Sequence, residues 1–187
     1  MGYEGVVPSV RAHVESARHI VVGGVSGTGK SSVARALADR LGWVFLEGDE
    51  LHPKANVTAM TAGRALTDED RWPWLDAIAR WAADQEAAGR STVTACSALR
   101  RVYRDRLRDG RRTSFVLLTA DREVLRERMQ RRVHFMPVRL LDSQLATYEP
   151  PGPDEDGIEV DATQPLDDTI AQVVAGLGID DSAPETR

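Results

Sequence analysis

The sequence is poor in cysteine, in long apolar runs and in excess positive charge, and each absence excludes a class of protein. Cys96 is the only cysteine among 187 residues, so the chain can form no internal disulfide and fits a reducing compartment. No stretch approaches the roughly 20 apolar residues of a membrane-spanning helix. The net charge of −5 gives no bulk attraction to nucleic acid or to an anionic membrane. We therefore expect no nucleic-acid or membrane partner and a cytoplasmic location.

The length of the chain suggests a single α/β domain with room for a core. Residues 1–18 carry charges and lack the apolar centre of a signal peptide, and we interpret them as an N-terminal extension. Residues 19–179 form the predicted domain. Residues 180–187 are polar and are expected to be a flexible tail.

Residues 24–31 have the form G-x-x-x-x-G-K-S, which is the pattern of a phosphate-binding loop. Its glycines let the backbone curl so that successive N–H groups point at one anion. Lys30 is expected to reach the β- and γ-phosphates of ATP, and the Ser31 hydroxyl is expected to hold Mg²⁺. The predicted ATP-binding residues of this segment are Gly24, Val25, Ser26, Gly27, Thr28, Gly29, Lys30, Ser31 and Ser32.

Short β-type runs alternate with segments of helical periodicity along the chain. We predict strands near 19–23, 43–47, 91–96, 114–119 and 157–161, and helices near 30–41, 53–61, 68–88, 99–109, 121–131, 138–148 and 166–177. Such alternation favours right-handed β-α-β crossovers and a parallel sheet. The predicted fold class is α/β, with a five-stranded parallel sheet between layers of helices.

Two motifs that other phosphate-loop proteins carry are missing. A motor or transporter ATPase ends an apolar strand with an acidic residue for Mg²⁺, but here the run 93–96 continues into Ser97-Ala98-Leu99. A GTPase carries an Asn-Lys-x-Asp segment, and the sequence contains none. These absences leave the branch of small-molecule and nucleotide kinases.

Two acidic residues stand at the end of the second predicted strand, Glu47 and Asp49, separated by Gly48. Ligands of open α/β sheets bind beyond the carboxyl ends of the strands. One carboxylate there can sit near the metal, and the other near the acceptor hydroxyl. An Asp is suited to accept the proton of that hydroxyl. The alternative is that Asp49 caps the following turn.

At this point the sequence resembles the gluconate kinase family, phosphate-loop kinases related to shikimate kinase. The resemblance covers about residues 20 to 177 and is carried by the segments 24–31, 47–53, 66–75, 95–105, 134–137, 140–144 and 160–165. It implies ATP-dependent phosphorylation of D-gluconate at its 6-hydroxyl to 6-phospho-D-gluconate, which feeds carbohydrate acid catabolism and the pentose phosphate pathway. It also implies Mg²⁺ dependence, a homodimer and a mobile lid at about 128–140.

The resemblance implies roles for individual residues. Lys30, Asp49 and Arg132 match catalytic positions, and Ser31 and Glu47 match the metal site. Arg128 and Pro165 match the residues that hold the adenine. The residues matched to acceptor binding are Asp49, His52, Arg71, Ser97, Arg101, His134 and Gln144. A lid arginine such as Arg132 can neutralise charge on the transferring phosphoryl group.

Several alternatives stay open. Arg71 suits a gluconate carboxylate because of its planar guanidinium, but it can also form a surface ion pair with the acids at 68–70. Arg101 belongs to a set of arginines, at 100, 101, 104, 106 and 108, that is mostly expected on a solvated helix face. Other functions compatible with the motifs are phosphorylation of another small acid, such as shikimate, and nucleotide-dependent regulation without turnover.

Two departures from the family pattern concern the lid and the metal site. Glu47 stands where the family usually has aspartate, and Val133 stands where it usually has glycine. A β-branched residue adopts a positive φ only at a cost, so the geometry of the lid is expected to differ.

Overall fold

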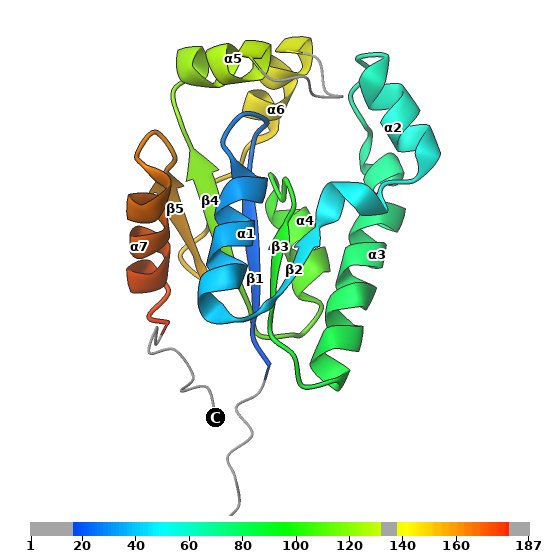
Figure 1. Cartoon of the computed structure of the whole chain (residues 1–187). Coiled ribbons are helices and arrows are strands. Elements are labelled where there is room, and N and C mark those ends of the chain that lie inside the picture. The colour runs from blue at the N-terminus through cyan, green and yellow to red at the C-terminus, as the bar shows by residue number, and fades with distance from the viewer. Residues whose placement is uncertain (1–16, 132–137, 180–187) are drawn as a thin grey trace, which may run out of the picture.

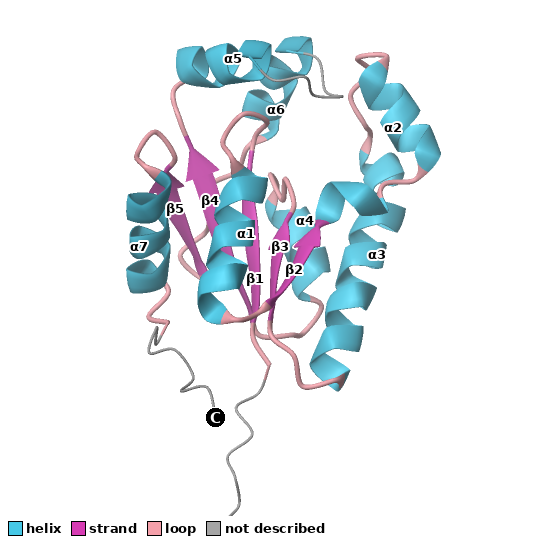
Figure 2. Cartoon of the chain, in the orientation of Figure 1, coloured by secondary structure: helices cyan, strands magenta, loops and turns pink. Residues whose placement is uncertain are grey.

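The structure is a computed structural model that describes residues 17–131 and 138–179. Five parallel strands form one sheet in the order β2-β3-β1-β4-β5. The strands are β1 (His19–Gly24), β2 (Val44–Glu47), β3 (Thr92–Ala95), β4 (Thr113–Thr119) and β5 (Gly157–Asp161). All arrowheads in Figure 2 point to the same end of the molecule, so the loops that follow the strands gather at one edge.

Helices cover both faces of the sheet, because side chains alternate along each strand. Ile20 and Val22 point to a core shared with α1 (Lys30–Leu41) and α7 (Leu166–Gly176). Val21 points to the opposite core, shared with α3 (Asp68–Ala87) and α4 (Arg101–Arg108). The predicted three-layer α/β fold is thereby confirmed (Figure 1).

The remaining elements stand beyond the carboxyl ends of the strands (Figure 1). They are the helices α2 (Lys54–Thr61), α5 (Arg122–Arg131) and α6 (Leu141–Thr147) and the two 3₁₀ turns η1 (Gly48–Leu51) and η2 (Val138–Leu140). They surround the edge where the phosphate loop emerges from β1, which is the edge where α/β sheets bind ligands.

The predicted strands and helices are all present, with ends that differ by at most two residues. The segment 138–148, predicted as one helix, is a 3₁₀ turn followed by α6. The lid predicted at about 128–140 has α5 on one side and η2 on the other, and its residues 132–137 lie outside the described part of the chain.

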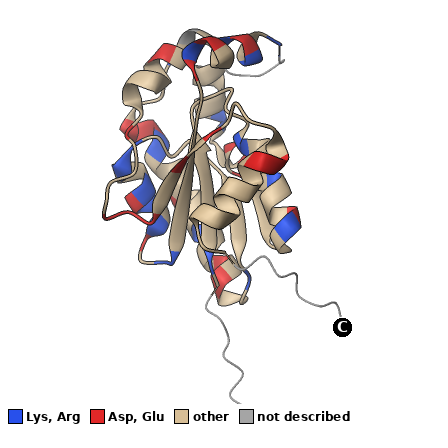
Figure 3. Ribbon diagram, turned by 90° about the vertical axis from the view of Figure 1, so that its left-hand side faces the viewer, with Lys and Arg blue, Asp and Glu red and all other residues tan. Residues whose placement is uncertain are grey.

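Most charged residues lie on the outside of this architecture, and the pair of Arg104 and Glu155 is a buried exception. Figure 3 shows red and blue residues interspersed on the outer elements, while the strands are mostly tan. In the part of the chain that the structure describes, no helix has the length and apolarity needed to cross a membrane.

Candidate active site

The phosphate loop joins β1 to α1 through backbone conformations that favour glycine. Gly27 and Gly29 have φ angles of 88° and 91°. At Gly24 a Cβ atom would lie 2.5 Å from the carbonyl oxygen of Leu118, so the loop can pass β4 only without a side chain. Among the described residues, no side chain caps the N-terminus of α1. The first N–H groups of the helix therefore face the loop, where an anion would accept from them.

Lys30 begins α1 and turns its side chain back over the loop. Its Nζ donates to the carbonyl oxygen of Val25 at 3.1 Å. Burial lowers the pKa of Lys30, and the nearby Asp49 and the more weakly acting Glu47 oppose this shift. A cation held at the mouth of the loop is positioned to meet a phosphate.

Glu47 ends β2 beside the start of α1. The Ser31 hydroxyl hydrogen-bonds to the Glu47 carboxylate, while burial raises the pKa of Glu47. Gly48 follows, and a Cβ atom there would lie 2.5 Å from the carbonyl oxygen of Ala95. This close contact between β2 and β3 sets the turn η1, which carries Asp49 to the same edge as Lys30.

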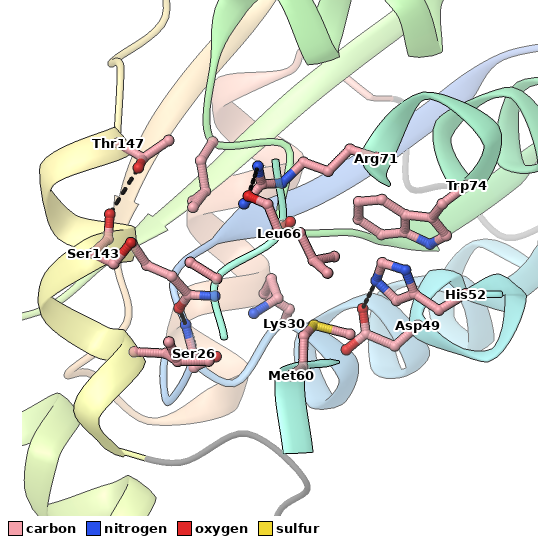
Figure 4. Close-up of a pocket in the computed structure, with 15 residues that line it drawn as sticks. Ser26, Lys30, Asp49, His52, Met60, Leu66, Arg71, Trp74, Ser143 and Thr147 are labelled. Carbon is pink, nitrogen blue, oxygen red and sulfur yellow. Dashed lines mark hydrogen bonds and ion pairs between the residues drawn. The ribbon is translucent and has the colours of Figure 1, made fainter. Parts of the chain in front are cut away.

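A second pocket opens next to the phosphate loop, as Figure 4 shows. Ser26, Lys30 and Asp49 line both this pocket and the hollow over the loop, which Gly27, Gly29, Ser31 and Met129 complete. The other walls of the second pocket come from η1, α2, α3, the segment after β3, and α6. Its lining residues include His52, Met60, Leu66, Arg71, Trp74, Ser97, Leu99, Ser143, Gln144 and Thr147.

His52 lies flat on Trp74 in this pocket. Their ring centroids are 4.0 Å apart with an interplanar angle of 17°, and the Trp74 Nε1–H donates to the carbonyl oxygen of Gly48 at 2.7 Å. Nε2 of His52 lies 3.9 Å from Oδ1 of Asp49. Burial lowers the pKa of His52 to about 4, against the attraction of Asp49 and together with repulsion by Arg71, so the imidazole is neutral at neutral pH.

Arg71 enters the pocket from the first turn of α3. A capping box fixes that turn, because Thr67 and Asp70 exchange hydrogen bonds between side chain and backbone. The guanidinium donates to the carbonyl oxygen of Leu66 at 2.6 Å and to the Tyr103 hydroxyl at 3.3 Å. Its separation from Asp68 is 3.8 Å, so neutral oxygens hold Arg71 more closely than the expected surface ion pair does.

Gln144 connects α6 to the phosphate loop. Its Oε1 accepts the backbone N–H of Ser26 at 2.8 Å. Ser97 follows β3, and its carbonyl oxygen accepts the N–H of Gly24 at 2.9 Å. Both residues line the second pocket, so the structure brings them to the side chains of His52 and Arg71.

The residues predicted to hold the adenine lie on the other side of the loop. Arg128 of α5 donates to the carbonyl oxygen of Ala162 at 2.9 Å, in the segment that leads to Pro165, the N-cap of α7. Arg132 and His134 lie outside the described residues.

The arginines of α4 divide into exposed and buried ones. Arg101 is 43% exposed and forms a bidentate pair with Asp154 at 2.7 Å, and it does not line the second pocket. Arg104, by contrast, is fully buried and pairs with Glu155. The expectation of a solvated face is therefore wrong for Arg104, because Glu155 and the carbonyl oxygens of Ala98, Leu99, Glu149 and Pro150 replace water around its guanidinium.

Sequence reasoning missed three polar residues that contact the lining residues His52 and Arg71 from behind: Asn56, Asp68 and Tyr103. Asn56 is 4% exposed and lies one helical turn after His52, a spacing that could have pointed to it. The Tyr103 hydroxyl donates to Asp68 at 2.5 Å and accepts from Arg71, a contact that links α4 to α3. No local sequence pattern predicts the contact between Tyr103 and Asp68.

Comparisons with known proteins show which family the chain resembles over most of its length. A family model described as AAA domain matches residues 20–151. The gluconokinase of Gluconobacter oxydans (strain 621H) is 48% identical over 166 residues, which cover 88% of this chain and 93% of that protein. The thermoresistant gluconokinase of Escherichia coli (strain K12) is 41% identical over 157 residues, covering 82% and 90%.

Solved structures give the same picture. An unliganded sugar kinase from Janibacter sp. HTCC2649 has a TM-score of 0.85 at 46% identity, covering 90% of this chain and 99% of its own. A gluconokinase from Sinorhizobium meliloti 1021 has a TM-score of 0.78 at 46% identity, covering 87% and 93%. The shikimate kinase of Aquifex aeolicus, at 16% identity and a TM-score of 0.61, shares the fold. The chain therefore belongs to the gluconokinase family of phosphate-loop kinases.

Proposed function

We propose that the protein transfers the γ-phosphoryl group of ATP to the 6-hydroxyl of D-gluconate and releases ADP and 6-phospho-D-gluconate. The observation that carries this proposal is the shared wall of Ser26, Lys30 and Asp49 between two pockets. A phosphoryl donor over the loop and an acceptor in the second pocket would meet at this wall. Family membership supports gluconate as the acceptor.

On the donor side, the loop N–H groups hold the phosphates and Lys30 neutralises charge on the γ-phosphoryl group. Catalysis of phosphoryl transfer consists mostly of such positioning and charge stabilisation. The geometry of Arg128 and Ala162 supports an adenine site between α5 and Pro165. Arg132 of the expected lid would complete the donor side. It lies outside the described residues.

The Ser31 hydroxyl and the Glu47 carboxylate fit Mg²⁺. Both are hard oxygen donors, and partial burial raises the pKa of Glu47, whose charged form a cation would stabilise. Within residues 17–131 and 138–179, no three His, Cys, Asp or Glu side chains gather as a metal site. This agrees with Mg²⁺, which keeps water ligands and binds with the phosphates of its substrate. When bound there, Mg²⁺ would neutralise charge on the phosphates.

On the acceptor side, Asp49 orients the 6-hydroxyl and takes its proton as the bond to phosphorus forms. Arg71 meets the carboxylate at the other end of gluconate. The hydroxyls along the carbon chain of gluconate contact His52, Ser97 and Gln144. We assign the same role to His134, which lies outside the described residues. An acceptor with both a terminal hydroxyl and a carboxylate is required to engage both ends.

A coupled ADP-release assay tests the proposal. D-Gluconate should stimulate ADP release in the presence of Mg²⁺, while shikimate and D-glucitol, which lacks the carboxylate, should not. Preference for shikimate would move the acceptor assignment to another small acid. ATP binding without release for any acceptor would favour a regulatory protein without turnover.

We also propose a homodimer in the cytoplasm with no nucleic-acid or membrane partner. The net charge of −5 supports the lack of a nucleic-acid or membrane partner, and the single cysteine supports the cytoplasm. The homodimer is what the family resemblance implies. Light scattering at micromolar concentration measures the oligomeric state.

A further inference from the structure

Asn56 stands behind His52 and Asp49 and has no role in the reaction proposed above. Asn56 of α2 contacts His52, and His52 in turn faces Asp49. We propose that Asn56 is a positioning residue that fixes the tautomer of His52, so that the imidazole presents an Nε2–H to Asp49. The tautomer stands on geometry alone, while its consequence for turnover rests on the proposed role of Asp49.

The first step is the orientation of the Asn56 side chain. One end of its amide lies 2.7 Å from the backbone carbonyl oxygen of Asp70. A carbonyl oxygen only accepts, so this end must be the donor, Nδ2. Asn56 is 4% exposed, so its burial and this hydrogen bond hold the amide in one orientation.

The second step is the proton of His52. The same Nδ2 lies 3.4 Å from Nδ1 of His52. Because Nδ2 donates and cannot accept, Nδ1 must accept and carries no proton. In a neutral imidazole the proton then sits on Nε2. Stacking on Trp74 fixes the ring plane, so this N–H has one direction.

The third step is what the N–H meets. Nε2 lies 3.9 Å from Oδ1 of Asp49, beyond direct hydrogen-bond length, and Figure 4 draws this contact. Hydrogen bonds of ligand-free active sites are often long and tighten when substrate binds. The donor attracts one carboxylate oxygen and leaves the other for the acceptor hydroxyl. The opposite tautomer would aim a lone pair at the same carboxylate and repel it.

Burial keeps His52 neutral, against the net effect of the charged groups that face it. Asp49 of η1 favours the imidazolium, Arg71 of α3 opposes it, and burial, which is the largest effect, lowers the pKa to about 4. The side chain of His52 is 4% exposed. His52 therefore does not titrate between pH 6 and 9, and the single donor toward Asp49 persists through that range.

Nitrogen-15 NMR of the histidine rings tests the tautomer in the unmodified protein. The chain has four histidines, and the signal missing from His52→Gln identifies His52. We expect the pattern of an Nε2–H, neutral imidazole from pH 6 to 9. An Nδ1–H pattern, or an imidazolium at pH 7, would overturn the proposal whatever the enzyme phosphorylates.

Asn56→Asp tests the consequence. A carboxylate at this position accepts, so it stabilises Nδ1–H and raises the pKa of His52. Below the raised pKa the imidazolium still donates to Asp49, and above it the lone pair faces Asp49. The ratio of the variant's kcat to the wild-type kcat should thus fall about 10-fold or more as pH rises from 6 to 8.5, with KM for ATP unchanged. Wrong-tautomer losses reach about 10⁴-fold where histidine itself is the base.

Thr58→Asp is the matched control, because it adds the same charge to the exposed side of α2 two residues away. Its kcat ratio should not vary with pH. If the ratio of the Asn56→Asp kcat to the wild-type kcat does not vary with pH, Asn56 has a packing role only. In an Asp49→Asn background the effect of Asn56→Asp on kcat should vanish, because the group to be oriented is gone. An undiminished effect there would show that Asn56 does not act through Asp49.

Discussion

The phosphate-binding part of the site is made of one continuous segment, while the acceptor side is assembled from five separate ones. Residues 24–31 present their own backbone to the phosphates, with glycines where φ is positive. Asp49, Arg71 and Gln144 reach the acceptor pocket from η1, α3 and α6. Binding of the phosphates thus depends on local chain conformation, whereas choice of the acceptor depends on how distant elements pack.

This contrast predicts that changes on the nucleotide side act on every acceptor alike. Lys30→Ala should lower kcat/KM by about 10²- to 10³-fold, because the ammonium stabilises the transferring group more in the transition state than in bound ATP. Steady-state kinetics with a thermal-unfolding control measures the loss. A folded variant with near-normal turnover would contradict the phosphate-loop mechanism.

Asp49 stands on the boundary between the two sides, and Asp49→Asn removes its basic oxygen while keeping its shape. We expect kcat to fall about 10²-fold, at the low end for a general base, because a loose transition state forms little bond to the nucleophile. Binding of ATP, measured by calorimetry, should change little. Weakened ATP binding with normal kcat at saturation would make Asp49 part of the metal site instead.

Arg71→Met separates the two substrates, since it keeps the aliphatic stem and removes the charge. Loss of a charge-assisted pair of about 2–3 kcal/mol should raise KM for gluconate about 30- to 160-fold and leave KM for ATP nearly unchanged. An equal rise for both substrates, or no rise, would return Arg71 to the ion pair with Asp68.

Gln144 links the two sides, and Gln144→Glu keeps an oxygen for the Ser26 N–H while replacing the donor nitrogen by a negative charge. We expect about a 10-fold loss of kcat/KM, because charge–charge repulsion acts on the transferring phosphoryl group. Gln85→Glu, at the far end of α3, is the matched control. Equal effects of the two variants would remove Gln144 from the site.

Arg101 should give the smallest effect. Its pair with Asp154 is exposed, and such pairs contribute about 0–1 kcal/mol. Arg101→Met should change KM for gluconate less than about 2-fold. A change like that of Arg71→Met would restore the acceptor role that the family resemblance assigns to Arg101.

The same contrast explains what the sequence predicts and what it hides. Alternation of β-type and helical runs predicts the sheet and its helices, since these patterns are local. The phosphate loop is likewise local, so its residues can be named from spacing alone. Asp49 can be placed near the acceptor from the end of a predicted strand. Arg71 and Gln144 are assigned through the family resemblance, because their sequence distances from Asp49 carry no geometric information.

Two residues show where local patterns fail. Arg104 looks like its neighbours in an arginine-rich helix, but Glu155 and four carbonyl oxygens, supplied partly by a distant loop, bury it completely. Asn56 looks like a surface residue of a short helix, yet its amide meets a carbonyl oxygen of α3. In both cases the hydrogen-bond partner belongs to another element of the fold, so the role of the residue cannot be predicted from the local sequence.

The most direct test of a shared wall between the two pockets is the identity of the product. Phosphorus-31 and carbon-13 NMR of a reaction with ATP, Mg²⁺ and D-gluconate locates the transferred phosphate. We expect one phosphate ester at carbon 6 for each ADP formed, and no ester from 6-deoxygluconate, which presents no hydroxyl to Asp49. Phosphorylation at another carbon, or equal ADP release with 6-deoxygluconate, would contradict the account.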